Sequence, residues 1–132
     1  MLALDGVGVP IRCPYKKDVE RQKDYRFCKV GFAIIVLAGT DVDSQFICAT
    51  AQHRGSNNDI KAWEDSDLCH YLEAEKGLPE KYFFVGDEAF TNTIQFLSPW
   101  PGCGLDHNRD AFNYWLSHLR QCVEPAFGML IQ

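Results

Sequence analysis

The 132-residue sequence predicts an α/β domain in which helices flank a mixed sheet. Runs rich in β-branched and aromatic residues come first, segments with a helical spacing of apolar residues follow, and Gly- and Pro-rich stretches separate them. The expected order is a strand, a hairpin of two strands, a helix, a strand and a helix. The length and a hydrophobic share of 46% suit one domain with a single core.

Three strands are expected in the first half of the chain. Residues 2–11 form the first strand, with Asp5 inside it. Residues 27–39 and 45–52 form the next two, and they should pair antiparallel because the TDVDS stretch between them favours a turn. The polar stretch 13–26 is expected to be a charged surface loop. We expect the three strands to be neighbours in one sheet.

A helix, a strand and a second helix are expected in the second half. Asp59 stands at an N-cap position before residues 60–77, where apolar residues keep helical spacing. Residues 82–87 are predicted to be a strand that ends in an Asp. The SPWPGCG stretch is predicted to be a loop because two Pro and two Gly do not fit a regular element. The last helix should begin near Asp110.

The last predicted helix has two different faces. Apolar residues three or four apart should face the core, together with Phe127 further along: Phe112, Trp115, Leu119 and Val123. Polar residues at i, i+4, i+7 and i+11 share one side: Asn113, Ser117, Arg120 and Glu124. Pro125 is expected to kink or restart the helix just after Glu124 because proline lacks a backbone donor.

Composition restricts the class of protein. The net charge of −5 argues against a nucleic-acid binder, because backbone phosphates repel an acidic surface. The sequence has no apolar run long enough for a transmembrane helix and no basic start typical of a signal peptide. The six cysteines lack the spacing of a zinc site, and we expect them to be reduced, as in an intracellular protein.

Three acidic residues stand where a carboxylate needs compensation. Asp5 lies within the first strand, Asp87 ends the fourth, and Glu124 lies on the polar face of the last helix. A shared cation would compensate all three, because Mg²⁺ and Mn²⁺ prefer carboxylate ligands and two such ions can catalyse phosphodiester cleavage. In the alternative, all three are ordinary surface acids and Glu124 pairs with Arg120 one turn earlier. Spacing alone leaves both open.

Four ordered blocks carry a family resemblance: LALDGVGVPI, RGSNNDIKAWEDSDL, YFFVGDEAF with SPW, and FNYWLSHLRQCVEPAFG. They resemble the transposase domain of the PIF/Harbinger group, which are DDE superfamily endonucleases with an RNase H-like fold. The likeness covers nearly the whole chain, with a 36-residue gap between Asp87 and Glu124. It implies that residues 1–132 form a truncated catalytic core, without the N-terminal helical region and C-terminal extension of relatives.

The resemblance also implies roles for single residues. The catalytic acids of the family, which would bind two Mg²⁺ or Mn²⁺ ions, fall on three residues: Asp5, Asp87 and Glu124. Asp59 matches a further recurrent acid, for which helix capping and metal contact are both open. Asn113 and Arg120 match the polar face before the family's Glu, and Arg120 would orient Glu124 or contact a phosphate.

The implied function is that of a divalent-metal-dependent DNA endonuclease or transposase catalytic domain. Water would attack a phosphodiester bond and leave a free 3′-hydroxyl. The implied partners are DNA and a separate Myb-like DNA-binding protein, and the implied location is the nucleus. Two alternatives stay open: a decayed or domesticated relative that acts as a non-catalytic interaction module, and an RNase H-like nuclease that acts on RNA.

Overall fold

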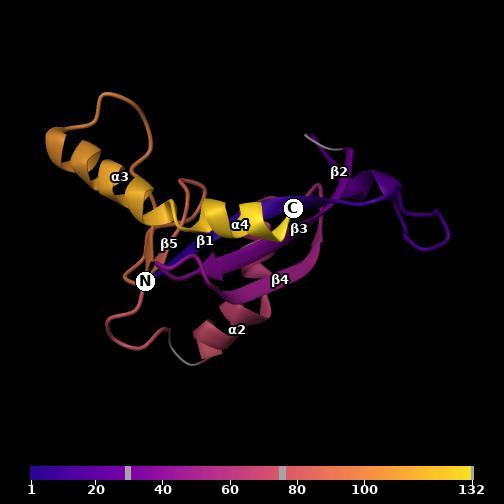
Figure 1. Cartoon of the computed structure of the whole chain (residues 1–132), viewed down its shortest axis with the longest axis horizontal. Coiled ribbons are helices and arrows are strands. Elements are labelled where there is room, and N and C mark those ends of the chain that lie inside the picture. Colours follow the sequence, from indigo (N-terminus) through magenta and orange to yellow (C-terminus); the bar gives the residue numbers. More distant parts are fainter. Residues whose placement is uncertain (29–30, 75–76, 132) are drawn as a thin grey trace.

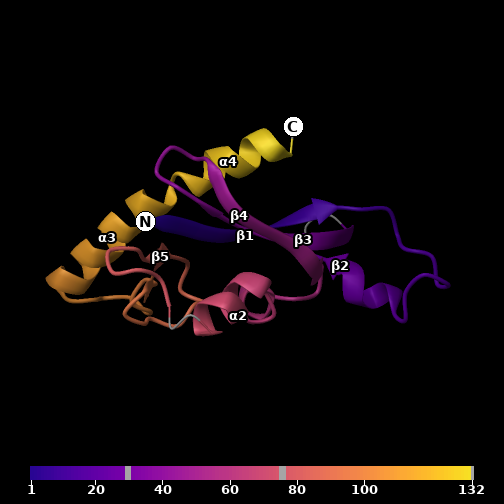
Figure 2. The same cartoon turned by 90° about the horizontal axis from the view of Figure 1, so that it is seen from below.

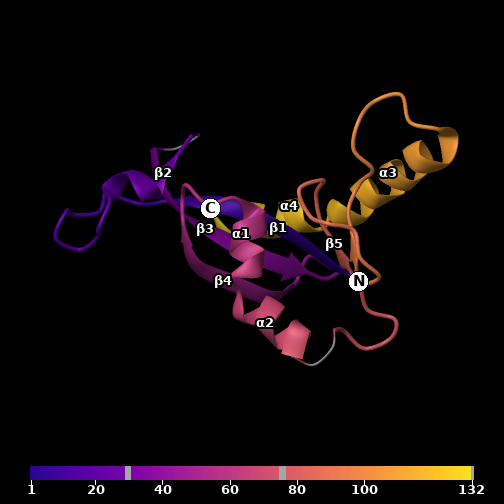
Figure 3. The same ribbon diagram turned by 180° about the vertical axis from the view of Figure 1, so that it is seen from behind.

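The computed structural model describes residues 1–28, 31–74 and 77–131. One mixed sheet forms its centre, with α3 and α4 on one face and α1 and α2 on the other (Figures 2 and 3). In the described ranges this sheet contains β1 (Leu2–Pro10), β2 (Arg26–Phe27), β3 (Gly31–Thr40), β4 (Phe46–Arg54), β5 (Phe84–Val85) and β6 (Phe96–Leu97). The predicted α/β class with a mixed sheet is therefore confirmed.

The strand order along the sheet is β2-β3-β1-β5-β6, and β4 also pairs with β3. The pairs β1–β3 and β3–β4 are antiparallel, whereas β1–β5 and β5–β6 are parallel. The predicted hairpin and its position beside the first strand are thus confirmed. In its turn, the Asp41 carboxylate accepts hydrogen bonds from the backbone N–H groups of Asp43 and Gln45.

The second predicted strand, residues 27–39, is in fact divided between β2 and β3. The two parts pair antiparallel with each other, Arg26 opposite Phe32, so the chain reverses between them. Gly31 has a φ of +93°, a left-handed conformation that glycine adopts without a steric penalty. Residues 29 and 30 lie outside the described part of the chain. Strand β6 was not predicted, because two residues carry no recognisable alternation.

The helix predicted over residues 60–77 is two helices, α1 (Asp59–Glu64) and α2 (Asp67–Ala74). Ser66 lies at the break and is almost fully buried. Its hydroxyl donates to the carbonyl of Trp63 and accepts from the N–H of Cys69, so one side chain ends α1 and begins α2. The predicted helix end includes residues 75–76, which lie outside the described ranges.

The last predicted helix is also divided, into α3 (His107–Arg120) and α4 (Val123–Leu130). It begins three residues before the predicted start because Asp106 caps α3. The prediction that Pro125 interrupts the helix after Glu124 is wrong. The interruption comes earlier, and Pro125 lies in the first turn of α4, where a backbone N–H has no partner within the helix.

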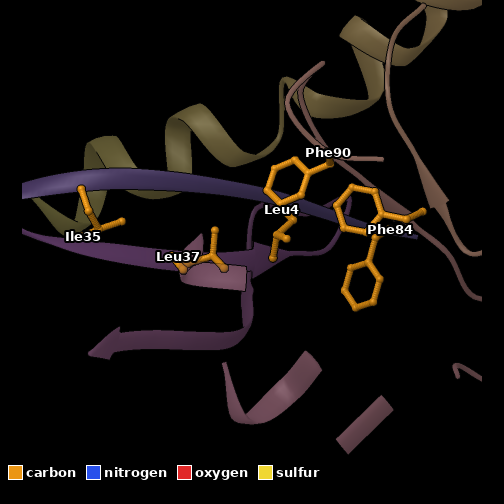
Figure 4. Packing of buried hydrophobic residues seen from close by; sticks show 7 residues of the cluster. Leu4, Ile35, Leu37, Phe84 and Phe90 are labelled. Carbon is orange, nitrogen blue, oxygen red and sulfur yellow. The ribbon is translucent and has the colours of Figure 1, made fainter. Parts of the chain in front are cut away.

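Two apolar clusters hold the layers together, one on each face of the sheet. The cluster beneath α1 includes Leu4, Ile35, Leu37, Phe84 and Phe90 (Figure 4). The cluster beneath α4 is smaller and consists of four buried residues: Ala3, Ala38, Val123 and Phe127. Strand β1 contributes to both clusters, because successive residues of a strand point to opposite faces.

The core face predicted for the last helix is partly wrong. Val123 and Phe127 are buried as expected, but Trp115 is 66% exposed and Leu116 is buried instead. Helix α3 extends beyond the edge of the sheet, so most of its surface has no layer to pack against (Figure 1). None of the helices in the described ranges is both long and apolar enough to cross a membrane.

Candidate active site

Asp5 lies on β1, on the face that α3 and α4 cover. Its neighbours Leu4 and Gly6 face α1, so alternation along the strand directs the Asp5 side chain to the other side. One carboxylate oxygen accepts a hydrogen bond from the Gly6 N–H at 2.9 Å, and the other lies 3.4 Å from a terminal nitrogen of Arg120. Its side chain is 27% exposed, so the charge is only partly hydrated.

The electrostatic surroundings of Asp5 include one cation and two other acids. Burial is the main reason that its pKa is raised, and the hydrogen bond from Gly6 and the charge of Arg120 oppose the rise. The negative charges of Asp87 and Glu124 raise it further. The structure therefore brings into one neighbourhood the three acids that lie on separate elements of the sequence.

Asp87 owes its position to the parallel pairing of β1 with β5. Ala3 is opposite Val85 in this pair, and Asp5 and Asp87 each follow two residues later along the chain. The strand predicted over residues 82–87 is only Phe84–Val85, so Asp87 lies just beyond its end rather than within it. Gly86, between Val85 and Asp87, has no room for a side chain because the rings of Phe90 and Phe96 pack against its α carbon. This packing explains why a glycine precedes the acid. The Asp87 carboxylate itself accepts a hydrogen bond from the N–H of Ala89.

Glu124 is exposed in the first turn of α4. The preceding residue, Val123, is fully buried against β1 and β3, so the start of α4 is held firmly on the sheet. Arg120 forms its ion pair with Asp5. The alternative ion pair of Arg120 with Glu124 is not found among the described residues.

Asp59 does not cap α1, contrary to one of the two predicted roles. Asn58 is the N-cap, and its side chain accepts a hydrogen bond from the N–H of Lys61 at 2.9 Å. The half-buried Asp59 carboxylate lies against the α carbon of Gly6, in the space that a side chain at this position would fill. Its pKa is raised by burial first and then by the charges of Asp5 and Asp87. Asp59 therefore belongs to the same electrostatic group, approached from the α1 face of β1.

The two predicted supporting residues have different surroundings. Asn113 donates to and accepts from the backbone of Trp100, so it fastens the loop before α3 to that helix. Arg120 is the last residue of α3, and its Nε is buried. Among the described residues, no group accepts a hydrogen bond from this Nε. A buried donor without an acceptor is costly, so Arg120 is suited to a further acceptor.

A comparison with protein families agrees with this geometry. The sequence model for a DDE superfamily endonuclease matches residues 4–132, nearly the whole chain. The chain belongs to this superfamily. No curated protein and no solved structure matches the chain significantly. Membership of the DDE superfamily indicates a nuclease or transposase type of function, with DNA as substrate and a general use of divalent metal ions.

The donors present suit such a metal in kind. DDE superfamily enzymes take a hard cation, and the neighbourhood of Asp5 supplies carboxylate oxygens that are partly buried and repel one another. Within the described residues, however, no group of three or more His, Cys, Asp or Glu has an arrangement that could hold a metal ion. Arg120 provides the positive charge beside Asp5.

Sequence reasoning missed two features of this DDE superfamily site. The space above Gly6 that admits Asp59 depends on a contact between residues far apart in the chain, and no local pattern indicates it. The unsatisfied Nε of Arg120 depends on how α3 meets the sheet. The sequence had singled out Asp59 through the RGSNNDIKAWEDSDL block and Arg120 through the polar face of the last helix.

Proposed function

We propose that residues 1–132 form the catalytic domain of a PIF/Harbinger-type transposase with an RNase H-like fold, a DNA endonuclease that uses two divalent cations. The observation that carries the proposal is that the charges of Asp87 and Glu124 both act on Asp5, although the three acids come from the segment after β5, from α4 and from β1. Ordinary surface acids would have no reason to come together from separate elements.

The side chains would divide the work as follows. Asp5 would hold the ions from β1, Asp87 from the segment after β5, Glu124 from α4, and Asp59 from the α1 side of β1. Bound Mg²⁺ or Mn²⁺ supplies activation of the attacking water and stabilisation of the leaving oxygen. Arg120 would donate to a phosphate oxygen of DNA.

The proposed subtype brings further components. A separate Myb-like DNA-binding protein would direct the domain to its DNA, and the domain would act in the nucleus. Water would attack one phosphodiester bond and leave a 3′-hydroxyl. Asn113 would act at a distance, by holding the Trp100 loop against α3.

A nicking assay on supercoiled plasmid tests this function. We expect the parent protein to nick DNA with Mn²⁺ and not with EDTA, leaving ends that a polymerase extends directly. Asp87→Asn and Glu124→Gln should reduce nicking to background, whereas the matched charge removals Asp43→Asn and Glu80→Gln, at exposed positions elsewhere, should not. Equal nicking by all five proteins would refute the assignment of the acids.

One observation favours a second candidate, a non-catalytic interaction module. No set of metal-binding side chains is already assembled in the described residues, and Arg120 is paired with Asp5. If the protein is such a module, Mn²⁺ will neither stimulate nicking nor raise the melting temperature of the parent, although the fold remains intact.

A further inference from the structure

Positive charge is concentrated in one segment of this acidic chain. Residues 12–26 contain six of the 13 Lys and Arg residues but only three of the 18 Asp and Glu residues. The segment therefore carries +3, and the rest of the chain carries −8. The overall value of −5 conceals this separation, so it is a poor guide to what each surface attracts.

All six cationic side chains of the segment are exposed: Arg12, Lys16, Lys17, Arg21, Lys23 and Arg26. Within the described part of the chain, none of them forms an ion pair. Asp24, in contrast, is paired with Arg54 at 2.8 Å, which neutralises one of the three acids of the segment. The cations are thus available to an external anion.

The segment is a folded arm with a fixed base. The Gln22 side chain donates to the carbonyl of Pro14 at 2.6 Å, and a short 3-10 helix, η1 (Gln22–Tyr25), follows. At the base, the Ser56 N–H donates to the Asp24 carbonyl. This basic arm, residues 12–26, extends beyond the sheet at the end opposite α3 (Figure 1). Because it is ordered before binding, less conformational entropy is lost on contact with a ligand.

Strand β1 connects the arm directly to the candidate active site. From Asp5 to Ile11 the chain advances six residues, roughly 20 Å at about 3.3 Å per residue. Roughly six base pairs of duplex DNA, at about 3.4 Å each, span this distance. We propose that the basic arm binds backbone phosphates of duplex DNA about six base pairs from the bond at the active site. The inference rests on the proposed function, which supplies DNA as the ligand.

Two triple variants of equal net charge test the proposal. Lys16→Gln, Lys17→Gln and Lys23→Gln remove three charges from the arm; Lys61→Gln, Lys81→Gln and Arg109→Gln remove three exposed charges elsewhere. Both variants carry −8 in place of −5. Binding to a labelled duplex of about 25 base pairs is measured by fluorescence anisotropy in EDTA between about 50 and about 200 mM KCl, because phosphate contacts are read from the salt dependence.

We expect the arm variant to bind at least about tenfold more weakly at the lowest salt. Its plot of log affinity against log salt concentration should be shallower by about 2.7, since each phosphate contact contributes about 0.9. The control variant should bind within about twofold of the parent, and replacing the three arm lysines by arginine should preserve binding, since both side chains contact phosphate. Melting temperatures should match closely throughout, because all these side chains are exposed and the two ion pairs lost in the control variant, Lys61–Asp65 and Arg109–Asp106, are surface pairs of small effect.

Equal weakening by both triple variants would overturn the proposal, since affinity would then follow net charge alone. Unchanged binding by the arm variant, or no binding by the parent at any salt concentration, would also overturn it. The nicking assay distinguishes a failure of the arm proposal from a failure of the proposed function. A parent that nicks DNA while the arm variant binds normally refutes only the arm. An arm variant that binds weakly supports the arm whether or not the parent nicks.

Discussion

Gly6 and Asp59 meet where α1 reaches the strand that carries Asp5. The Asp59 carboxylate occupies the space beside the Gly6 α carbon, and the contact is with the end of a movable side chain rather than with backbone. A methyl group at position 6 would therefore displace Asp59 without displacing the helix. Single-residue changes here can separate effects on the acids from effects on the fold.

We expect Gly6→Ala to change the free energy of unfolding by about 1 kcal/mol or less, because Asp59 can move aside and alanine restricts the unfolded chain. It should nevertheless remove as much Mn²⁺-induced stabilisation as Asp59→Asn, and the double variant should remove no more. The control is Gly8→Ala on the same face of β1, which meets the Phe27 ring and should lower stability while keeping the response to Mn²⁺. Thermal melts with and without Mn²⁺ measure both. Additive losses in the double variant would contradict the shared mechanism.

The raised pKa of Asp59 predicts how stability depends on pH in metal-free solution. The folded state binds this proton more tightly than the unfolded state, so the contribution to stability is fully present below the ordinary value of 3.8 and is lost as pH rises through the raised pKa. Asp59→Asn removes the titrating group. The free energy of unfolding of the variant minus that of the parent, from urea unfolding with EDTA, should be larger at pH 7 than at pH 4. A difference that does not vary with pH would contradict the electrostatic account.

A melting series tests the acids as a metal site. Mn²⁺ at about 100 times its dissociation constant should stabilise the parent by about 2.7 kcal/mol. Asp87→Asn and Glu124→Gln should melt at or above the parent without metal, because one repelling charge is gone, and should lose most of the gain with Mn²⁺. Asp43→Asn and Glu80→Gln should keep it. If Mn²⁺ stabilises all five proteins equally, the acids are not a metal site.

At the scale of elements, the division of the last helix decides which of its residues are core. A continuous helix would direct Trp115 and Val123 to one side, but the interruption before α4 lets Leu116 take the buried position. Leu116→Ala should lower the free energy of unfolding by about 2–5 kcal/mol, as for other buried leucines. Trp115→Ala should change it by less than about 1 kcal/mol because its side chain is mostly exposed. Urea unfolding of both variants distinguishes this arrangement from the continuous apolar stripe, which predicts the reverse order.

Local patterns were sufficient to predict the hairpin, because a turn and two apolar runs determine it within a short stretch of chain, but not the bounds of the short strands β2 and β5 or the existence of β6. They were not sufficient for the helix ends. The break at Ser66 depends on the burial of its hydroxyl, and Asn58 and Asp59 are equally good capping residues until the fold directs one of them to Gly6. For the site, a carboxylate inside the first predicted strand and another at the end of the fourth indicated Asp5 and Asp87. Arg120 pairs with Asp5 through a contact between residues far apart in the chain, and spacing in the sequence does not reveal it.

At the scale of the whole molecule, β1 contributes residues to both apolar clusters. Leu4 belongs to the cluster beneath α1 and Ala3 to the cluster beneath α4. The two layers should therefore unfold together. Far-UV circular dichroism, which reports all helices, and the fluorescence of Trp63 in a variant with Trp100→Phe and Trp115→Phe should give the same midpoint in urea. Two separate midpoints would show that the layers are independent.

The separation of charge along the molecule also affects how it meets DNA. A body of −8 joined to an arm of +3 makes the free protein an electric dipole, with its positive end beyond the sheet. The field of a polyanion turns a dipole before any contact forms, so approach by the arm is favoured and approach by the body is opposed. Encounters in which the arm faces the DNA are therefore favoured. The association rate falls as added salt shortens the range of the field, even where the final contacts are unchanged.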